Sequence, residues 1–241
     1  MQDAPGPYDA DWYARHADAF GWGPETAHVD PEREDWLRRW VRGSVLDVGC
    51  GTGPYVDLLA RAGHDARGID HSDPLVAWAR DHREGAFDVG DACDLPYEDD
   101  SFDTVLALDI LEHVDDERAL AEAVRVTRRR VVVGVPARTP DALLDAGLLF
   151  RHHEDPSHLR VYRREELVSL LERSGLEVGQ VEGVGAVDWN GLLLRNVRHR
   201  RPRLERFAHR VLFKVLRHVP PQRHASGWLA LADLPACGGD R

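Results

Sequence analysis

Short apolar runs and helical periodicities alternate along the first two thirds of the chain. Residues 45–48 have the apolar character of a buried strand, and they lead through a glycine-rich turn into residues 55–62, whose apolar positions recur with helical spacing. Gly63 is the residue expected to end this helix. The same order of strand and helix recurs further along the chain. We therefore predict an α/β domain built on a largely parallel sheet.

The other elements follow from the same patterns. Ser72 with Pro74, and later Asp115, mark the starts of helices, because serine and aspartate side chains accept hydrogen bonds from a first helical turn. Continuously apolar strands are typical of the centre of a parallel sheet. The predicted strands are residues 45–48, 66–70, 87–89, 102–108, 131–135, 176–184 and 228–232, and the predicted helices include residues 54–62, 72–79, 115–124 and 162–174.

The turn at residues 49–53, Gly-Cys-Gly-Thr-Gly, is the most distinctive stretch of the chain. Glycines allow a sharp bend and let the backbone approach a ligand closely. A ligand at the carboxyl edge of a parallel sheet fits this position. The spacing differs from the dinucleotide pattern G-x-G-x-x-G and from phosphate loops that end in Gly-Lys-Ser/Thr. A tight turn without a ligand is the alternative, and the entropic cost of three glycines disfavours it.

Residues 45–53, with Asp47 inside the strand, resemble motif I of class I S-adenosylmethionine-dependent methyltransferases. The resemblance continues through residues 95–103 and 108–114, and more loosely through residues 162–176. It implies a doubly wound, seven-stranded, Rossmann-like sheet in the order 3-2-1-4-5-7-6, with an antiparallel strand seven. It also implies S-adenosylmethionine as the cofactor and methyl transfer as the activity, as in small-molecule methyltransferases of ubiquinone and menaquinone biosynthesis.

Cofactor contacts are expected at the ends of the first strands. Asp70 ends the second strand, where a carboxylate can accept hydrogen bonds from both hydroxyls of a ribose; a role only in capping the next helix is the alternative. The resemblance places Asp91 near the adenine amino group and the N–H of Ala92 at a ring nitrogen. The predicted cofactor-binding residues are Asp47, Gly49, Cys50, Gly51, Gly53, Asp70, His71, Asp91, Ala92 and Asp109.

Candidate catalytic residues follow the strand 102–108. Asp109, Glu112 and His113 match, with one conservative change, the Glu-x-x-Glu-His stretch of quinone O-methyltransferases. We predict Asp109 and His113 as catalytic, with His113 as general base for an acceptor hydroxyl. A divalent cation held by the three side chains could instead lower the pKa of that hydroxyl, but we predict no metal. In the simplest alternative, Asp109 contacts cofactor or water, Glu112 is a surface residue and His113 caps the following helix.

The acceptor is predicted to be a small molecule, methylated at oxygen in preference to nitrogen or carbon. Residues 107–110 read Ala-Leu-Asp-Ile, whereas methyltransferases for amino groups of bases carry Asn/Asp-Pro-Pro-Tyr/Phe, so no nucleic-acid partner is expected. In the loop 151–159, His158 is the candidate substrate contact, and His152 and His153 are expected to be solvated. A dinucleotide-dependent oxidoreductase and a noncatalytic cofactor- or partner-binding protein are the rival functions.

Two segments flank or interrupt this domain. Residues 1–43 are predicted to form an N-terminal helical lid on the domain 44–241, with Tyr8, Trp12, Tyr13 and Trp22 either covering the cofactor or packing a helix onto the sheet. An insertion at about residues 186–225 has ten basic residues and one acidic residue between positions 195 and 224. Its apolar residues follow helical spacing. This basic amphipathic helix either closes one end of the domain or gives weak contact with an anionic membrane surface or a lipid-linked substrate.

Composition bears on the setting of the protein. The 241 residues suit one domain with a large core, and the net charge is -11, with Lys214 as the single lysine. Neither a signal peptide nor the ~20-residue apolar run of a membrane span is recognisable, so we expect a cytoplasmic protein. Cys50, Cys93 and Cys237 form no Cys-x-x-Cys pair, which argues against a disulfide framework or a thiolate zinc site.

Overall fold

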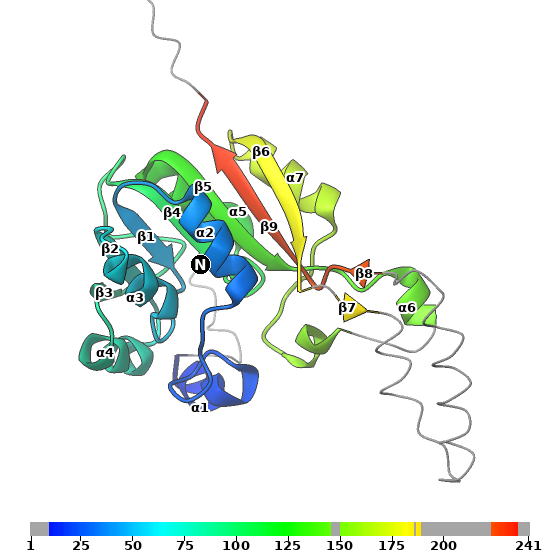
Figure 1. Ribbon diagram of the computed structural model, residues 1–241, viewed down its shortest axis with the longest axis horizontal. Helices are drawn as coiled ribbons and strands as arrows, with labels where there is room; N and C mark the ends of the chain where they lie inside the picture. Colours follow the sequence, from blue (N-terminus) through cyan, green and yellow to red (C-terminus); the bar gives the residue numbers. More distant parts are fainter. Residues whose placement is uncertain (1–9, 146–149, 186, 189–222, 236–241) are drawn as a thin grey trace, which may run out of the picture.

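Figure 1 shows a computed structural model of the protein, which describes residues 10–145, 150–185, 187–188 and 223–235. Its centre is a seven-stranded sheet in the order β3-β2-β1-β4-β5-β9-β6. Neighbouring strands from β3 to β5 are parallel, and β9 is antiparallel to both β5 and β6. This is the predicted order, with β9 as the antiparallel seventh strand. The strands are β1 (Val45–Val48), β2 (Ala66–Asp70), β3 (Ala86–Val89), β4 (Phe102–Leu108), β5 (Thr127–Pro136), β6 (Glu177–Val184) and β9 (Gly227–Asp233).

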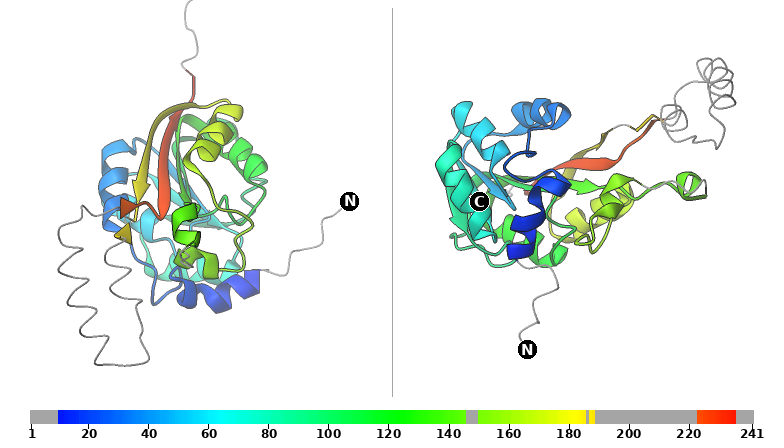
Figure 2. Two further views of the ribbon diagram at one scale, coloured as in Figure 1. Left: turned by 90° about the vertical axis from the view of Figure 1, so that its right-hand side faces the viewer. Right: turned by 90° about the horizontal axis from the view of Figure 1, so that it is seen from below.

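Helices cover both faces of the sheet (Figures 1 and 2). Side chains of α2, α3 and α4 pack in one apolar cluster, and side chains of α5 and α7 pack in a second cluster across the sheet. The helices are α1 (Ala10–Phe20), α2 (Pro31–Trp40), α3 (Pro54–Arg61), α4 (Asp73–His82), α5 (Asp116–Val126), α6 (Asp141–Asp145) and α7 (Arg164–Arg173), with a 3₁₀ turn η1 (Arg151–Glu154). None of the helices within the described ranges is long and apolar enough to span a membrane.

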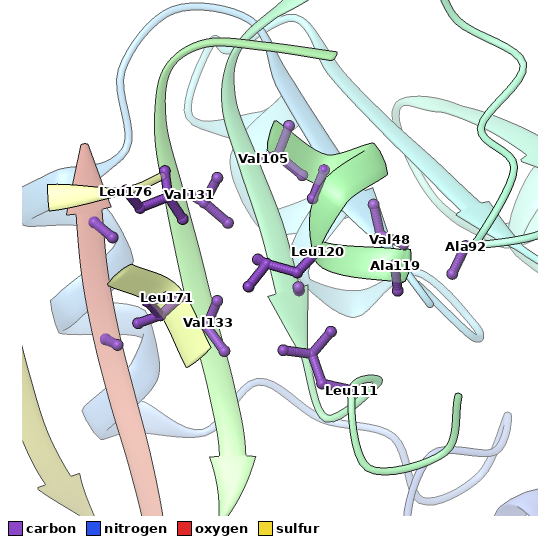
Figure 3. Close-up of a cluster of buried hydrophobic side chains, with 14 of the residues drawn as sticks. Val48, Ala92, Val105, Leu111, Ala119, Leu120, Val131, Val133, Leu171 and Leu176 are labelled. Atoms are coloured by element: carbon purple, nitrogen blue, oxygen red, sulfur yellow. The ribbon is translucent and has the colours of Figure 1, made fainter. Parts of the chain in front are cut away.

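Alternation along the central strands divides the core between the two faces. Val105 and Val131 point toward α5 and α7, where they meet Leu120 and Leu171 (Figure 3). The next residue on each strand points the other way, because successive side chains of a strand alternate. On β4 that residue is Leu106, which belongs to the cluster around α2 and α3. Burial on both faces explains the continuous apolar runs in the sequence.

One predicted boundary is wrong in an informative way. We expected the helix ending at residue 174 to begin at Tyr162, but α7 begins at Arg164. Tyr162 is buried beside the sheet, where its backbone pairs with Ala137 and its hydroxyl donates to Asp116 Oδ2 over 2.9 Å. In the sequence, Tyr162 has the spacing of a residue on the apolar face of the helix. In the fold it belongs to the loop before the helix, and its contacts hold that loop against the sheet.

Three predictions concern residues outside those described. Most of the basic insertion lies there, between the short paired strands β7 (Val187–Asp188) and β8 (Arg223–His224), as do Tyr8 and Cys237. The proposed amphipathic helix therefore stays a prediction from the sequence.

Candidate functional site

A cavity of about 1030 Å³ lies at the carboxyl ends of β1, β2, β3 and β4. Its walls are the turns that follow these four strands, together with residues of α1, α2 and the loop around η1. This volume lies just above the ~300–1,000 Å³ usual for small-molecule sites. The predicted site residues that line it are Asp47, Gly49, Cys50, Gly51, Asp70, His71, Asp91, Ala92, Asp109, His113 and His158.

Gly51 and Gly53, both in the turn after β1, have different structural roles. Gly51 has a φ of 51°, and a Cβ built there would have only the Trp22 carbonyl oxygen within 4 Å, at 3.8 Å. The backbone at Gly51 therefore has open space on the side of the cavity, where a ligand would lie. Gly53 has a φ of 71°, and its Cβ would lie 2.3 Å from Cε1 of Phe87. It is not among the residues that line the cavity, so the structure gives this glycine a packing role, and its predicted cofactor contact stays a prediction.

The carboxylate of Asp70 joins the turns after β1 and β2. Its Oδ2 accepts a hydrogen bond from the Gly51 backbone over 2.8 Å, and its Oδ1 accepts one from the Ser72 backbone over 2.9 Å. The bond to Ser72 shows that Asp70 does brace the start of α4, which was the alternative to a cofactor role. Each oxygen of a carboxylate has two lone pairs, so the side chain can brace the turn and also accept bonds from a ligand.

Asp47 is buried at the floor of the cavity, with 2% of its surface exposed. Burial, followed by the nearby charges of Asp70 and Asp109, raises the pKa of Asp47 to about 8. The side chain is consequently mostly protonated at pH 7. A cation bound in the cavity would favour the ionised form, because an opposite charge nearby stabilises the carboxylate.

A salt bridge that the sequence did not reveal crosses the cavity wall. Arg33 of α2 donates two hydrogen bonds to Asp109, one from Nη2 to Oδ1 over 2.8 Å and one from Nη1 to Oδ2. Desolvation by the cavity wall would raise the pKa of Asp109, whose side chain is 48% exposed, but the Arg33 guanidinium outweighs this effect and holds the pKa below its usual value. Asp109 has a φ of 54°, unusual for a residue with a side chain, so the chain turns sharply at this point. Nothing in the local pattern singles out Arg33 among the many arginines.

His113 lies in the cavity wall with its Nδ1 atom directed at hydroxyl groups. Ser157 Oγ is 3.0 Å and Tyr13 Oη is 3.3 Å from Nδ1. Burial and the neighbouring His158 lower the pKa of His113 to about 4, which keeps the imidazole neutral at pH 7. The alternative that His113 caps the next helix is wrong, because Asp115 precedes α5 and accepts the bond from the Arg118 backbone.

Glu112 is not the surface residue that one alternative assumed. It is 1% exposed, and its Oε2 has no hydrogen-bond partner. Burial and the charge of Asp109 raise the pKa of Glu112 well above its usual value. Glu112, His113 and His158 each bring one potential ligand atom within 4.8 Å of the others. Asp109, which the sequence grouped with them, is held by Arg33 instead, and the absence of a metal stays a prediction.

The histidines of the η1 loop are more buried than expected. His152 and His158 both line the cavity, and burial lowers the pKa of each, to about 4 for His152. The expectation of a solvated His152 is therefore wrong, while His153 is exposed as expected. The rings of His158 and His113 are 4.7 Å apart, edge to face. A substrate that reaches one of them would also meet the other.

The two N-terminal helices contact different parts of the molecule, and the predicted lid over the cofactor stays a prediction. α1 lies beyond the carboxyl ends of the strands (Figure 1), and Tyr13 and Trp22 line the cavity. The ring of Tyr13 packs edge to face against His71 at 5.0 Å and His113 at 5.7 Å. In contrast, α2 buries Trp36 and Leu37 in the core.

Comparisons with known proteins identify the family. Residues 46–133 match a family model described as a methyltransferase domain. The chain is 34% identical over 193 residues to the O-methyltransferase rstn1 of Aspergillus nomiae, an alignment that covers 68% of this chain and 83% of that protein. The chain is a class I S-adenosylmethionine-dependent methyltransferase.

Other relatives agree with this family. The methyltransferase is 38% identical over 92 residues to norajmaline N-methyltransferase of Rauvolfia serpentina, covering 34% of this chain and 32% of that one. It spans about half the length of two further curated relatives. Its fold matches a putative methyltransferase from Bacillus halodurans C-125 with a TM-score of 0.60 and 19% identity, over 85% of this chain and 99% of that one. The cofactor is S-adenosylmethionine, and a dinucleotide-dependent oxidoreductase is not supported.

Proposed function

We propose that this methyltransferase transfers a methyl group to an oxygen atom of a small-molecule acceptor, with His113 as the general base. The observation that carries the proposal is the position of the partly buried His113 imidazole in the wall of the cavity, with Nδ1 held by two hydroxyl groups and the ring neutral at pH 7. A general base must be unprotonated at working pH and within hydrogen-bond reach of the proton it removes. The low pKa of His113 meets the first condition, and its place in the cavity wall favours the second.

The residues around the cavity suit the parts of the cofactor. Gly51 leaves space at the turn, and the Asp70 carboxylate suits the ribose hydroxyls, because among the described residues its Oδ2 accepts only the bond from Gly51 while its Oδ1 meets Ser72 and His71. Asp91 uses Oδ1 to accept a bond from Cys93, which leaves Oδ2 for the adenine amino group beside the N–H of Ala92. Arg33 spends two of its five N–H donors on Asp109. Arg33 also hydrogen-bonds with the Tyr55 side chain, and we assign a remaining N–H to the carboxylate of the methionine part.

The chemistry requires little beyond alignment and removal of one proton. When bound, the cofactor supplies an electrophilic methyl group: a bond forms between this carbon and the acceptor oxygen while the carbon–sulfur bond breaks and leaves its electron pair on sulfur. The hydroxyl proton passes to His113. Holding the two reacting groups in one cavity accounts for much of the acceleration expected of such a reaction.

Relatives of the chain bear the names of both O- and N-methyltransferases, so the names do not decide the acceptor atom. The presence of a base favours oxygen as the acceptor atom. A neutral hydroxyl is a weak nucleophile, and removal of its proton raises its nucleophilicity more than it would for an amine. The edge-to-face rings of Tyr13 and His158 around His113 suit a flat, hydroxylated aromatic acceptor.

The test uses cofactor with an isotopically labelled methyl group and two matched panels, simple phenols and the corresponding aromatic amines. We expect labelled O-methyl products, and we expect His113→Ala to lower turnover by about 10²–10⁴-fold, the usual contribution of a general base. His82→Ala is the control, because His82 is exposed on α4 and stacks on Trp78 away from the cavity. Products only at nitrogen, or full turnover by His113→Ala, would reject the proposal. Cofactor binding without any product would favour the noncatalytic alternative.

We also propose that α1 and the segment up to residue 30 act as a lid on the cofactor. Tyr13 and Trp22 lie on the cavity side of this segment, and the hydroxyl of Thr52, in the glycine turn, donates to the Trp22 carbonyl over 3.1 Å. Limited proteolysis checks this role. S-adenosylhomocysteine should slow cleavage within residues 10–30 and leave cleavage in the exposed turn 98–101 unchanged; equal rates with and without the ligand would contradict a lid.

A further inference from the structure

We infer that Asp155 and Ser157 are positioning residues that hold the proton of His113 on Nδ1, so that Nε2 is left free to accept the proton of the acceptor hydroxyl. The inference rests on the proposed role of His113 as the base. It adds two residues that lie outside the methyltransferase motifs and act on the reaction through His113.

The partners of Ser157 determine where its hydroxyl proton points. Ser157 is 1% exposed and Asp155 is 7% exposed, so neither side chain turns to bulk water. Ser157 Oγ lies 2.5 Å from Asp155 Oδ1, and the same Oδ1 accepts a bond from the Ser157 backbone over 2.9 Å. A carboxylate only accepts hydrogen bonds. The hydroxyl proton of Ser157 is therefore donated to Asp155.

The Ser157 oxygen in turn fixes the tautomer of His113. Because Ser157 has spent its one proton, its oxygen offers only lone pairs to His113 Nδ1, 3.0 Å away. A hydrogen bond at this distance needs a proton on Nδ1. A neutral imidazole has one N–H, so Nε2 then carries the lone pair. The bond made by one ring nitrogen thereby sets the chemistry of the other.

The other groups that face the ring are compatible with this arrangement. Tyr13 Oη, from α1, lies 3.3 Å from Nδ1 and can accept a weaker share of the same proton, and it also hydrogen-bonds with the Ser157 side chain. In the described part of the chain, the two side-chain hydrogen bonds of the His113 ring are at Nδ1, and the ring also meets the Ser157 backbone, a contact that favours its charged form. The charged or titratable neighbours are His158 and Asp155 on the η1 loop and Asp109 after β4, with Glu112 next to His113 in the chain.

The same contacts also help after the proton is taken up. The imidazolium would have a positive charge, and Asp155 lies one hydroxyl away from its Nδ1–H. Burial and His158 disfavour that charge, whereas Asp155 and Asp109 favour it and offset part of the cost. Ser157 thus connects the base to a buried carboxylate.

The experiment reads the tautomer directly by ¹⁵N NMR of the full chain labelled at histidine, with S-adenosylhomocysteine bound, at pH 7. His113→Ala identifies the His113 signals. Ser157→Ala removes the hydroxyl but keeps the backbone bond to Asp155, which protects the fold of the loop. Ser101→Ala is the control, because Ser101 bonds to the Glu98 carbonyl in a turn that does not line the cavity.

We expect the wild type and Ser101→Ala to show the proton on Nδ1, and Ser157→Ala to move it toward Nε2. Turnover of the phenol that the wild type methylates best should fall at least about tenfold in Ser157→Ala, since a wrong tautomer costs up to about 10⁴-fold in serine proteases. Binding of S-adenosylhomocysteine should not change. Asp155→Asn, which can keep the bond from Ser157 but loses the charge, should lower turnover while the proton stays on Nδ1.

Two results would overturn the inference: a proton on Nε2 in the wild type, or a Ser157→Ala variant with unchanged tautomer or unchanged turnover. The proposed function fails by different results, namely no O-methylated product or full turnover by His113→Ala. The NMR measurement needs no acceptor, so it decides the tautomer even if the acceptor panels give no product.

Discussion

Replacing Asp70 by asparagine tests the cofactor site most directly. The carboxylate already accepts two backbone hydrogen bonds, from Gly51 over 2.8 Å and from Ser72 over 2.9 Å, and we assign its remaining lone pairs to the ribose hydroxyls. Asparagine has nearly the same shape, but one of its two terminal atoms donates hydrogen bonds instead of accepting them. The variant therefore loses one backbone bond, and only one oxygen is left to accept bonds from the other backbone N–H and from the ribose hydroxyls.

The size of the effect follows from the charge of the acceptor. A hydrogen bond to a charged group contributes about 1.5–3 kcal/mol, and each 1.4 kcal/mol corresponds to a factor of about ten in Kd. Loss of a single ribose bond should therefore raise the Kd for S-adenosylhomocysteine by about 10- to 100-fold. Loss of the backbone bond adds a smaller cost, because it loosens the turn in the free and the bound protein alike.

Isothermal titration calorimetry with S-adenosylhomocysteine measures the two Kd values. Asp73→Asn is the matched control, because Asp73 is exposed in the first turn of α4, three residues away, and does not line the cavity. A thermal unfolding curve for each variant separates a local from a global change. If Asp70→Asn folds normally and binds within about twofold of the wild type, Asp70 does not hold the ribose and the assignment is refuted.

Three further predictions concern charge. Asp47→Asn should remove a pH dependence of stability. The pKa of Asp47 is raised to about 8 in the folded state, so the folded protein binds more protons than the unfolded chain between about pH 4 and 8. The free energy of unfolding of the wild type therefore falls as pH rises through this window, by up to about 1.4 kcal/mol per pH unit. Denaturant titrations at pH 5, 6.5 and 8 should show a shallower fall for the variant, and equal slopes would contradict the buried, protonated Asp47. Arg33→Leu should weaken binding of S-adenosylhomocysteine by about tenfold or more in calorimetry, through loss of a charge-assisted bond to its carboxylate, whereas Arg38→Leu on the exposed side of α2 should not. The basic segment 195–224 should make the full chain co-sediment with anionic vesicles at low salt and release it at high salt; no co-sedimentation at low salt would end the idea of membrane contact.

The sequence by itself determined the strands and helices and the position of the glycine turn and Asp70 at the ends of two strands, while the order of the strands was implied by the family resemblance. Strands and helices depend on residues a few positions apart, and the apolar runs at residues 102–108 and 131–135 mark central strands without any knowledge of their neighbours. The glycine turn and Asp70 were predictable for the same reason, because each directly follows a recognisable strand. In a parallel sheet the ends of such strands meet at one edge, so their residues come together in space.

Only the tertiary structure decided what surrounds the reacting centre. Arg33 meets Asp109 across 76 residues of sequence, and Ser157 meets His113 across 44. Glu112 is buried because the loop before α7 covers it, and no local pattern distinguishes it from an exposed glutamate. These contacts depend on how α2 and the η1 loop pack over the sheet edge. A side chain's partner, protonation and tautomer follow from that packing, because desolvation and charge act through space and not along the chain.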